Sequence, residues 1–237
     1  MNAMSRHVSG PLSELLHIIF PAICCHCGAV LVGDERDLCT SCMSLVPWAR
    51  LAAVQDNDVE QRFAGRIPCQ AAASLLFFRH GNVAQTLVHQ IKYADNLRLA
   101  KQFGGLLGEE LLASGRFDGV DCLVPVPLHP LRKLKRGYNQ SELLCRAIAS
   151  VLNKPVVVNN LIRKRYTVSQ THKNRMDRMD NMSEVFAVRH PEQFENKHLL
   201  LVDDIITTGA TTENCYAALH DIPGLRISVA SLAVAFG

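Results

Sequence analysis

The chain has 237 residues, of which 48% are hydrophobic and 20% are charged. This composition is typical of a globular protein and excludes a disordered chain. The net charge is only +3, so the overall charge does not indicate a nucleic-acid-binding protein, and basic clusters must be judged locally. No apolar run reaches the roughly 20 residues that a membrane span needs, and we expect a cytoplasmic protein.

The first 47 residues are expected to form a leader helix and a cysteine-rich unit. The stretch LSELLHIIFP (residues 12–21) is apolar but short, and Glu14 and His17 interrupt it. Cysteines follow where the small-residue cleavage site of a signal peptide would lie. We therefore interpret the stretch as an amphipathic helix and not as a signal peptide.

Four of the nine cysteines fall into two C-x-x-C pairs, which eleven residues separate. Without a signal peptide, this pattern favours reduced thiols that bind a metal over disulfides. Four thiolates suit tetrahedral zinc, and a site with four protein ligands is structural because it has no open position. Redox-active cysteines are the alternative, and Cys25 and His26 lie where they could compete as ligands. The expected ligands are Cys24, Cys27, Cys39 and Cys42.

Residues 48–67 are mixed and polar, so we expect a linker or a surface excursion. From Pro68 onwards, segments with strand character alternate with segments of helical periodicity. The alternation predicts an α/β domain over residues 68–237, with a mostly parallel sheet flanked by helices, after a separate region of residues 1–67. The expected strands are 71–78, 155–158, 198–204 and 226–235, and residues 121–128 are expected as a strand that runs into a loop. The expected helices are 82–93, 97–113, 140–152 and 211–222.

The segment LLLVDDIITTGAT (residues 199–211) joins an apolar strand to two adjacent carboxylates and a glycine-containing turn. In open α/β sheets, ligands bind beyond the carboxyl ends of the strands, where we expect Asp203 and Asp204. The turn leads into a helix, whose free N–H groups bind phosphate, and Gly209 allows close approach of an anion. Carboxylates suit the hydroxyl groups of a ribose or a Mg²⁺ ion. A plain helix cap beside solvated carboxylates is the alternative, but adjacent carboxylates repel each other, so the pattern predicts a ribose 5-phosphate site.

The same segment matches the 5-phosphoribosyl 1-diphosphate (PRPP) motif of type I phosphoribosyltransferases, and the rest of the chain resembles the ComF family, named after a bacterial competence protein. The resemblance rests on FPAICCHCG, LCTSC, IKYADN, VPVPLHPLRKLKRGYNQS and RKRYTVSQTHKNRMDRMDN with SEVF. It implies a type I phosphoribosyltransferase fold with a small N-terminal zinc-ribbon-like unit of four cysteine ligands. It also implies that Asp203 and Asp204 are catalytic residues that hold the ribose. The implied phosphate-binding residues are Thr207, Thr208, Gly209, Ala210 and Thr211.

The loop VPVPLHPLRKLKRGYNQS (residues 124–141) follows a strand end and therefore lies on the ligand side of the sheet. It has four cations within five residues. Pyrophosphate needs several cations and close backbone donors, so we favour phosphate binding over a solvated basic face. By resemblance, Arg136 and Gln140 belong to the site, with Lys92 and Tyr93 nearby. An ordinary helix-end lysine is the alternative for Lys92.

Residues 163–182 are polar and basic without apolar periodicity. A long polar loop inside a compact domain is typical of a lid or of a disordered segment. Phosphoribosyl transfer passes through an oxocarbenium-like state that water would trap, so such an enzyme needs a lid. A surface loop that never closes on a ligand is the alternative. By resemblance, the residues of this flexible hood are Arg165, Thr167, Gln170, Arg178 and Asn181.

The resemblance implies a transferase that displaces pyrophosphate from PRPP with Mg²⁺ and passes the phosphoribosyl group to an acceptor that the sequence does not identify. We weigh two alternatives: an accessory protein that binds single-stranded DNA or the DNA-uptake machinery, and a regulator that binds PRPP without turnover. Against direct DNA binding, only 6% of the residues are aromatic, whereas single-strand binders stack bases on aromatic side chains. The sequence does not predict an oligomeric state.

Overall fold

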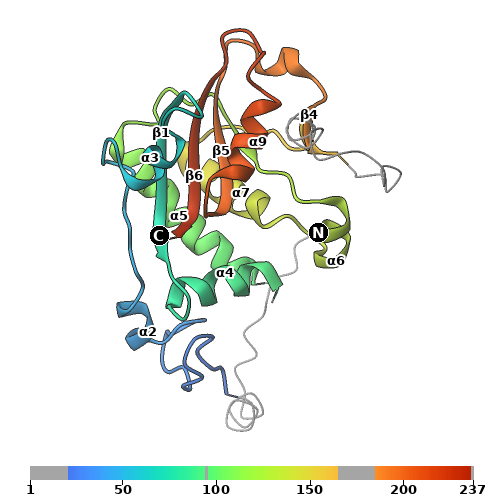
Figure 1. Ribbon diagram of the computed structural model, residues 1–237. Helices are drawn as coiled ribbons and strands as arrows, with labels where there is room; N and C mark the ends of the chain where they lie inside the picture. Colours follow the sequence, from blue (N-terminus) through green and yellow to red (C-terminus); the bar gives the residue numbers. More distant parts are fainter. Residues whose placement is uncertain (1–20, 94–95, 165–184, 236–237) are drawn as a thin grey trace, which may run out of the picture. The chain divides into compact units, whose positions relative to one another are not determined.

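The computed structural model describes residues 21–93, 96–164 and 185–235, and Figure 1 shows their helices and strands. The expected leader helix lies outside these residues, apart from Pro21 at its end. The chain forms two compact units, residues 1–46 and residues 47–237. Within the described ranges, no helix combines the length and the apolar character that crossing a membrane requires.

The first unit is built from short bridges and turns around the cysteines. Antiparallel bridges join Ile23 to Val30 and Arg36 to Leu38. Helix α2 (Thr40–Ser44) begins directly after Cys39, whose sulfur caps it by accepting the N–H of Cys42. Both cysteine pairs therefore sit at sharp changes of chain direction.

A four-stranded parallel sheet forms the centre of the second unit (Figure 1), which confirms the predicted α/β class. The strand order is β1-β6-β5-β2, and every neighbouring pair is parallel. Residues 199–202 of the inner strand β5 are fully buried, because a parallel strand with helices on both faces meets no solvent. The strands are β1 (Cys69–Phe78), β2 (Cys122–Pro125), β5 (His198–Ile206) and β6 (Arg226–Ala235).

Helices cover both faces of this sheet. On one face, α5 (Leu97–Ser114) packs along α7 (Gln140–Leu152), with α4 (Val83–Tyr93) beside α5. Small residues permit this close packing, since a Cβ atom on Gly104 would lie 2.7 Å from the Cβ atom of Ala147. On the other face, α3 (Asp58–Phe63) and α9 (Ala210–Ala217) enclose a continuous apolar core (Figure 1).

Residues 48–67, expected as a linker or a surface excursion, pack against the first strand of the sheet. The N–H of Ala49 donates to the carbonyl of Leu75 at 2.8 Å. The side chain of Asn57 caps α3 and also donates to the carbonyl of Ala72 at 2.8 Å. Phe63 is 1% exposed. These contacts make the segment part of the sheet unit. The sequence did not predict this packing, because the apolar positions of the segment have no regular period.

A helix forms where we expected a shaped loop. Helix α6 (Pro130–Arg136) has a proline at its first position, which suits a helix start. His129 caps its beginning, and Gly137 ends it in the left-handed conformation with φ +79°. The helix buries none of its residues, so apolar periodicity could not reveal it.

Two predicted elements need correction. Residues 155–158 form no named strand, because only Val156 makes a bridge, to Leu123 of β2. Helix α9 ends at Ala217 and not near residue 222. Leu219 and Ile222 are buried in the following turn, and their spacing imitates a continuing helix.

Three further short elements precede or follow residues 165–184 in the chain. Strands β3 (Leu161–Arg163) and β4 (Phe186–Val188) pair as an antiparallel hairpin apart from the main sheet. A 3-10 helix, η2 (Pro191–Phe194), follows β4 and buries Phe194. These pieces are too short for a sequence period to identify them.

Candidate functional site

Two buried carboxylates lie at the carboxyl end of β5. Asp203 is 8% exposed and Asp204 is 5% exposed. Oδ1 of Asp203 accepts a hydrogen bond from the Ser141 hydroxyl at 3.1 Å and from the Asp204 N–H at 2.8 Å. Nζ of Lys92 lies 2.9 Å from Oδ2 of Asp204. The ends of α7 and α4 thus meet the end of β5 at this acidic pair.

The acidic pair is costly to ionise completely. The pKa of Asp203 is raised to about 7, first by burial and then by the neighbouring Asp204 carboxylate. The Asp204 N–H, the Ser141 hydroxyl and Lys92 oppose this rise. A ligand that supplies hydroxyl donors or a cation would stabilise the ionised form of the two carboxylates.

The turn after the acidic pair requires glycine for two separate reasons. Gly209 has φ +84°, a conformation that strains residues with a side chain. A Cβ atom at this position would also lie only 2.8 Å from Cε1 of Phe63. Gly209 is the N-cap of α9, and the hydroxyl groups of Thr207, Thr208 and Thr211 belong to exposed residues on either side of it.

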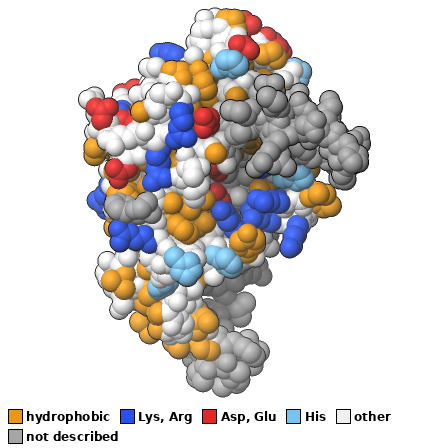
Figure 2. All heavy atoms as spheres, in the orientation of Figure 1, with side chains coloured by type: hydrophobic (Ala, Val, Ile, Leu, Met, Phe, Trp, Pro, Cys, Tyr) orange, Lys and Arg blue, Asp and Glu red, His pale blue; other side chains and the backbone are white. Residues whose placement is uncertain are grey.

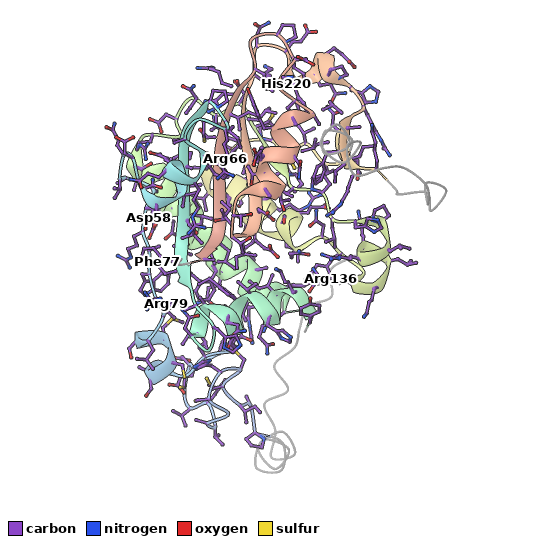
Figure 3. The ribbon with its side chains drawn as sticks, in the orientation of Figure 1. Asp58, Arg66, Phe77, Arg79, Arg136 and His220 are labelled. Atoms are coloured by element: carbon purple, nitrogen blue, oxygen red, sulfur yellow. The ribbon has the colours of Figure 1, made fainter. Side chains whose placement is uncertain are left out.

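Two arginines that the sequence did not suggest hold this turn from the side of α3. Arg62 donates from Nη1 to the carbonyl of Thr207 and from Nη2 to the carbonyl of Ala235. Arg66, which Figure 3 labels between α3 and α9, donates to the carbonyl of Thr208 at 3.2 Å and pairs with Glu213 at 3.1 Å. Because C=O and N–H point in opposite directions across a trans peptide, the N–H groups that follow these carbonyls point away from the arginines. That orientation suits an anion on the open side of the turn.

A cavity of about 470 Å³ lies beside the acidic pair. Nη1 of Arg136 lies 3.0 Å from Oε1 of Gln140, and its Nη2 lies 2.9 Å from the hydroxyl oxygen of Tyr93. Figure 3 shows Arg136 at the end of α6 next to α4, and Figure 2 shows a gathering of Lys and Arg side chains over α6. Lys92 joins the cavity to the acidic pair, which it contacts through Asp204. The cavity is lined by Lys92, Tyr93, Arg132, Lys135 and Arg136.

The structure therefore brings several expected site residues together and leaves others undescribed. Lys92 contacts the acidic pair, and Tyr93, Arg136 and Gln140 contact one another through Arg136. Ser141 was not among the expected residues, although it directly follows the RGYNQ element. The expected hood residues lie outside the described ranges; they are Arg165, Thr167, Gln170, Arg178 and Asn181.

The four paired cysteines converge in the first unit. Their sulfur atoms all lie within 4.8 Å of one another. Sγ of Cys27 and Sγ of Cys39 are 3.7 Å apart, close to the roughly 3.8 Å that tetrahedral zinc–sulfur bonds require. The group consists of Cys24, Cys27, Cys39 and Cys42.

Among the described residues, neither Cys25 nor His26 belongs to this group of side chains that could hold one metal ion. The pKa of the Cys25 thiol is raised to about 11, first by burial and then by the charges of Cys24 and Asp37. Gly28 has φ +75° and donates its N–H to the carbonyl of Cys24 at 2.9 Å. The chain therefore turns tightly after the first pair, as a metal knuckle requires.

Comparisons with solved structures give phosphoribosyltransferases and a related enzyme. Glutamine PRPP amidotransferase from B. subtilis, complexed with ADP and GMP, is 16% identical, with a TM-score of 0.43, over 61% of this chain and 30% of its own. The purine phosphoribosyltransferase from Pyrococcus horikoshii is 17% identical, with a TM-score of 0.38, over 57% of this chain and 73% of its own. No family model matches the chain.

Two sequence relatives match 48% and 80% of the chain. Competence protein F of Haemophilus influenzae is 33% identical over 114 residues, which are 48% of this chain and 50% of that protein. The DNA utilization protein YhgH of Salmonella typhi is 30% identical over 194 residues, which are 80% of this chain and 74% of that protein. Together with the paired cysteines and the motif at the end of β5, this alignment establishes that the chain belongs to the ComF family of competence and DNA utilization proteins.

Proposed function

We propose that this protein binds PRPP with Mg²⁺ and transfers the phosphoribosyl group to an acceptor, with release of pyrophosphate. The observation that carries the proposal is the buried acidic pair, Asp203 and Asp204, between a glycine turn and a basic cavity. Each part suits one portion of PRPP: the carboxylates suit the ribose, the turn suits the 5-phosphate, and the cavity suits the pyrophosphate.

The carboxylates of Asp203 and Asp204 are placed to accept hydrogen bonds from the two ribose hydroxyl groups. The raised pKa of Asp203 supports this assignment, because two donors would lower the cost of ionising a crowded, buried pair. The same charge balance fits Mg²⁺, which when bound would neutralise the oxygens of the leaving group. Lys92 already neutralises part of the charge of Asp204.

The turn of residues 207–211 is assigned to the 5-phosphate. Gly209 admits the anion close to the backbone, and α9 presents the N–H groups of its first turn. Arg62 and Arg66 act as positioning residues, because they hold the carbonyls of the turn on the opposite side. Neither arginine contacts the phosphate in this assignment.

The cavity between α4 and α6 is assigned to pyrophosphate. Lys92, Arg132, Lys135 and Arg136 line it, and several cations together stabilise the charge that develops on a leaving phosphate group. In the transfer, the bond from ribose C1 to the pyrophosphate oxygen breaks and its electron pair leaves with pyrophosphate. A bond forms between C1 and the acceptor's nucleophilic atom, and the released pyrophosphate takes up the proton that this atom loses.

The four-cysteine group is assigned to a structural zinc ion. Four thiolates complete a tetrahedral shell and leave no open position for chemistry. The sulfur separation of 3.7 Å between Cys27 and Cys39 supports the assignment. The zinc would stabilise a unit that is too small to build a large apolar core.

Calorimetric titration of PRPP with Mg²⁺ tests the main proposal. The wild-type chain is compared with the Asp203→Asn/Asp204→Asn double variant and with Asp221→Asn, whose side chain is 91% exposed. We expect the double variant to lose at least about 100-fold in affinity, since it removes two charge-assisted contacts, and the Asp221 variant to match the wild type. Absent binding by a folded wild type, or equal binding by the double variant, contradicts the proposal.

Single-stranded DNA binding is the second candidate, and α6 is the feature that favours it. Leu131 is 70% exposed and Leu134 is 84% exposed, and four cations surround them on the same short helix. Fluorescence anisotropy with a labelled oligothymidine, repeated at increasing salt, tests this candidate. Phosphate contacts are supported if DNA affinity falls steeply with salt concentration and if this dependence is weaker in Lys135→Ala. A wild type that does not bind the oligonucleotide contradicts them.

A further inference from the structure

A second cavity of about 470 Å³ lies at the carboxyl end of β2, between α6 and the β3–β4 hairpin. Its apolar lining includes Pro125, Pro127 and Leu161, of which Leu161 is 3% exposed. Cavities of this size accommodate small organic molecules, and half of the residues that line this one have polar or charged side chains. Proline rings and a leucine side chain offer flat contact to a planar ring.

The polar side chains of this cavity are mainly cations. Lys133, Lys164 and Arg189 have no acidic partner among the described residues, and Glu142 is the single acid of the lining. Oε1 of Glu142 already accepts two hydrogen bonds from Arg146, at 2.7 and 3.1 Å. The cavity therefore has an excess of positive charge that a ligand with a negative charge would balance.

One of the cations lies over an aromatic ring. The guanidinium of Arg163 lies 5.5 Å from the centre of the Phe186 ring, across the β3–β4 hairpin. A guanidinium is a planar fork that matches a carboxylate with two parallel hydrogen bonds. Its position on a paired strand gives this contact a defined direction.

The cavity borders the place where the chemistry is proposed. Pro125, in its lining, pairs in register with Val202, which directly precedes Asp203. Asn139, also in its lining, donates to the carbonyl of Val126 at 3.0 Å and is followed in the chain by Gln140 and Ser141 of the site. A ligand in this cavity would approach the end of the ribose site from the side of β2.

We propose that this cavity binds the acceptor, and that the acceptor is a planar ring compound with a carboxylate group. The inference rests on the proposed function, since an acceptor exists only for a transferase. The apolar lining would hold the ring, and Arg163 with Arg189 would hold the carboxylate. A nucleophilic nitrogen of the ring would then face C1 of PRPP.

Matched pairs of ring compounds test this inference by calorimetry with the full zinc-loaded chain, in the absence of PRPP so that no transfer consumes the ring compound. PRPP with Mg²⁺ is titrated separately. The pairs are nicotinate against nicotinamide and orotate against uracil, in each of which only the first member has a carboxylate, and inorganic phosphate serves as a separate anion. We expect at least one carboxylate to bind at least tenfold more tightly than its neutral partner. Arg189→Ala, at an exposed position, is expected to remove this preference and to leave PRPP binding unchanged. Arg163→Ala is expected to act in the same way, and Lys101→Ala, on the exposed side of α5, is expected to have no effect.

The outcomes separate this inference from the proposed function. If PRPP binds but neutral rings bind as well as carboxylates, or no ring compound binds, the inference is wrong and the PRPP site stands. If phosphate alone binds as tightly as the carboxylates and competes with them, the ring assignment is wrong. If a carboxylate binds through Arg189 while PRPP does not bind, the ligand class stands and its role as acceptor is wrong.

Discussion

Asp203→Asn is expected to stabilise the sheet unit while it weakens PRPP binding. Burial and the neighbouring Asp204 raise the pKa of Asp203 from its ordinary 3.8 to about 7. The unfolded chain ionises this carboxyl at low pH, whereas the folded chain resists ionisation until near neutral pH. The folded state therefore loses stability as the pH rises between these two values.

The magnitude follows from the same interval. The free energy of unfolding of the wild type falls as the pH rises from about 4 to about 7, by a total on the order of a few kcal/mol. The amide of the variant does not ionise, and its oxygen can still accept from Ser141 and from the Asp204 N–H, which now contact Oδ1. The stability difference between variant and wild type should thus widen from pH 4 to pH 7 and then remain level.

Urea unfolding at pH 5, 6, 7 and 8 without Mg²⁺ measures this difference. Trp48 is the single tryptophan of the chain and belongs to the sheet unit, so its fluorescence follows that unit. Asp118→Asn, at an exposed position of the same unit, is the control and should show a small difference that does not grow with pH. A variant that is less stable than the wild type at pH 8, or a difference that is the same at every pH, refutes the reasoning.

Three further predictions concern the turn and the cysteines. Gly209→Ala should destabilise the sheet unit by about 1–3 kcal/mol and lower PRPP affinity, because φ is +84° and a Cβ atom would meet Phe63. Urea unfolding measures the loss of stability. Gly105→Ala is the control and should not destabilise the unit, because a Cβ atom at that position meets open space. Arg62→Ala should lower PRPP affinity about tenfold by releasing the turn carbonyls, a loss of one to two hydrogen bonds, and calorimetry that finds full affinity contradicts its positioning role. Cys42→Ser should abolish zinc binding by atomic emission, since only three thiolates remain, and retained zinc would contradict the four-ligand site.

Much of the sheet unit follows from the sequence, because its strands and helices have clear periods. The apolar run of residues 199–202 predicts an inner parallel strand, and the strand is there with all four residues buried. Helix α5 ends at Ser114, one residue beyond the expected end at residue 113, and Gly115 caps it with φ +67°. The position of the acidic pair at a strand end is likewise a local consequence of where that run stops.

The elements that escaped prediction have no period to reveal them. Helix α6 buries no residue, so its composition resembles that of a polar loop. Helix α3 has only six residues, which is under two turns. The hairpin strands β3 and β4 have three residues each, and strands of this length do not alternate long enough to be recognised.

The sequence by itself determined the class of the fold, the paired cysteines and the motif that ends β5, because these depend on residues close together in the chain. Only the tertiary structure decided which distant residues support that motif. Arg62 reaches Thr207 across 145 positions, and Lys92 pairs with Asp204 from a different helix. Such contacts depend on strand order and helix placement, which bring the ends of distant elements together. The local sequence pattern of an element does not indicate which elements become its neighbours in space.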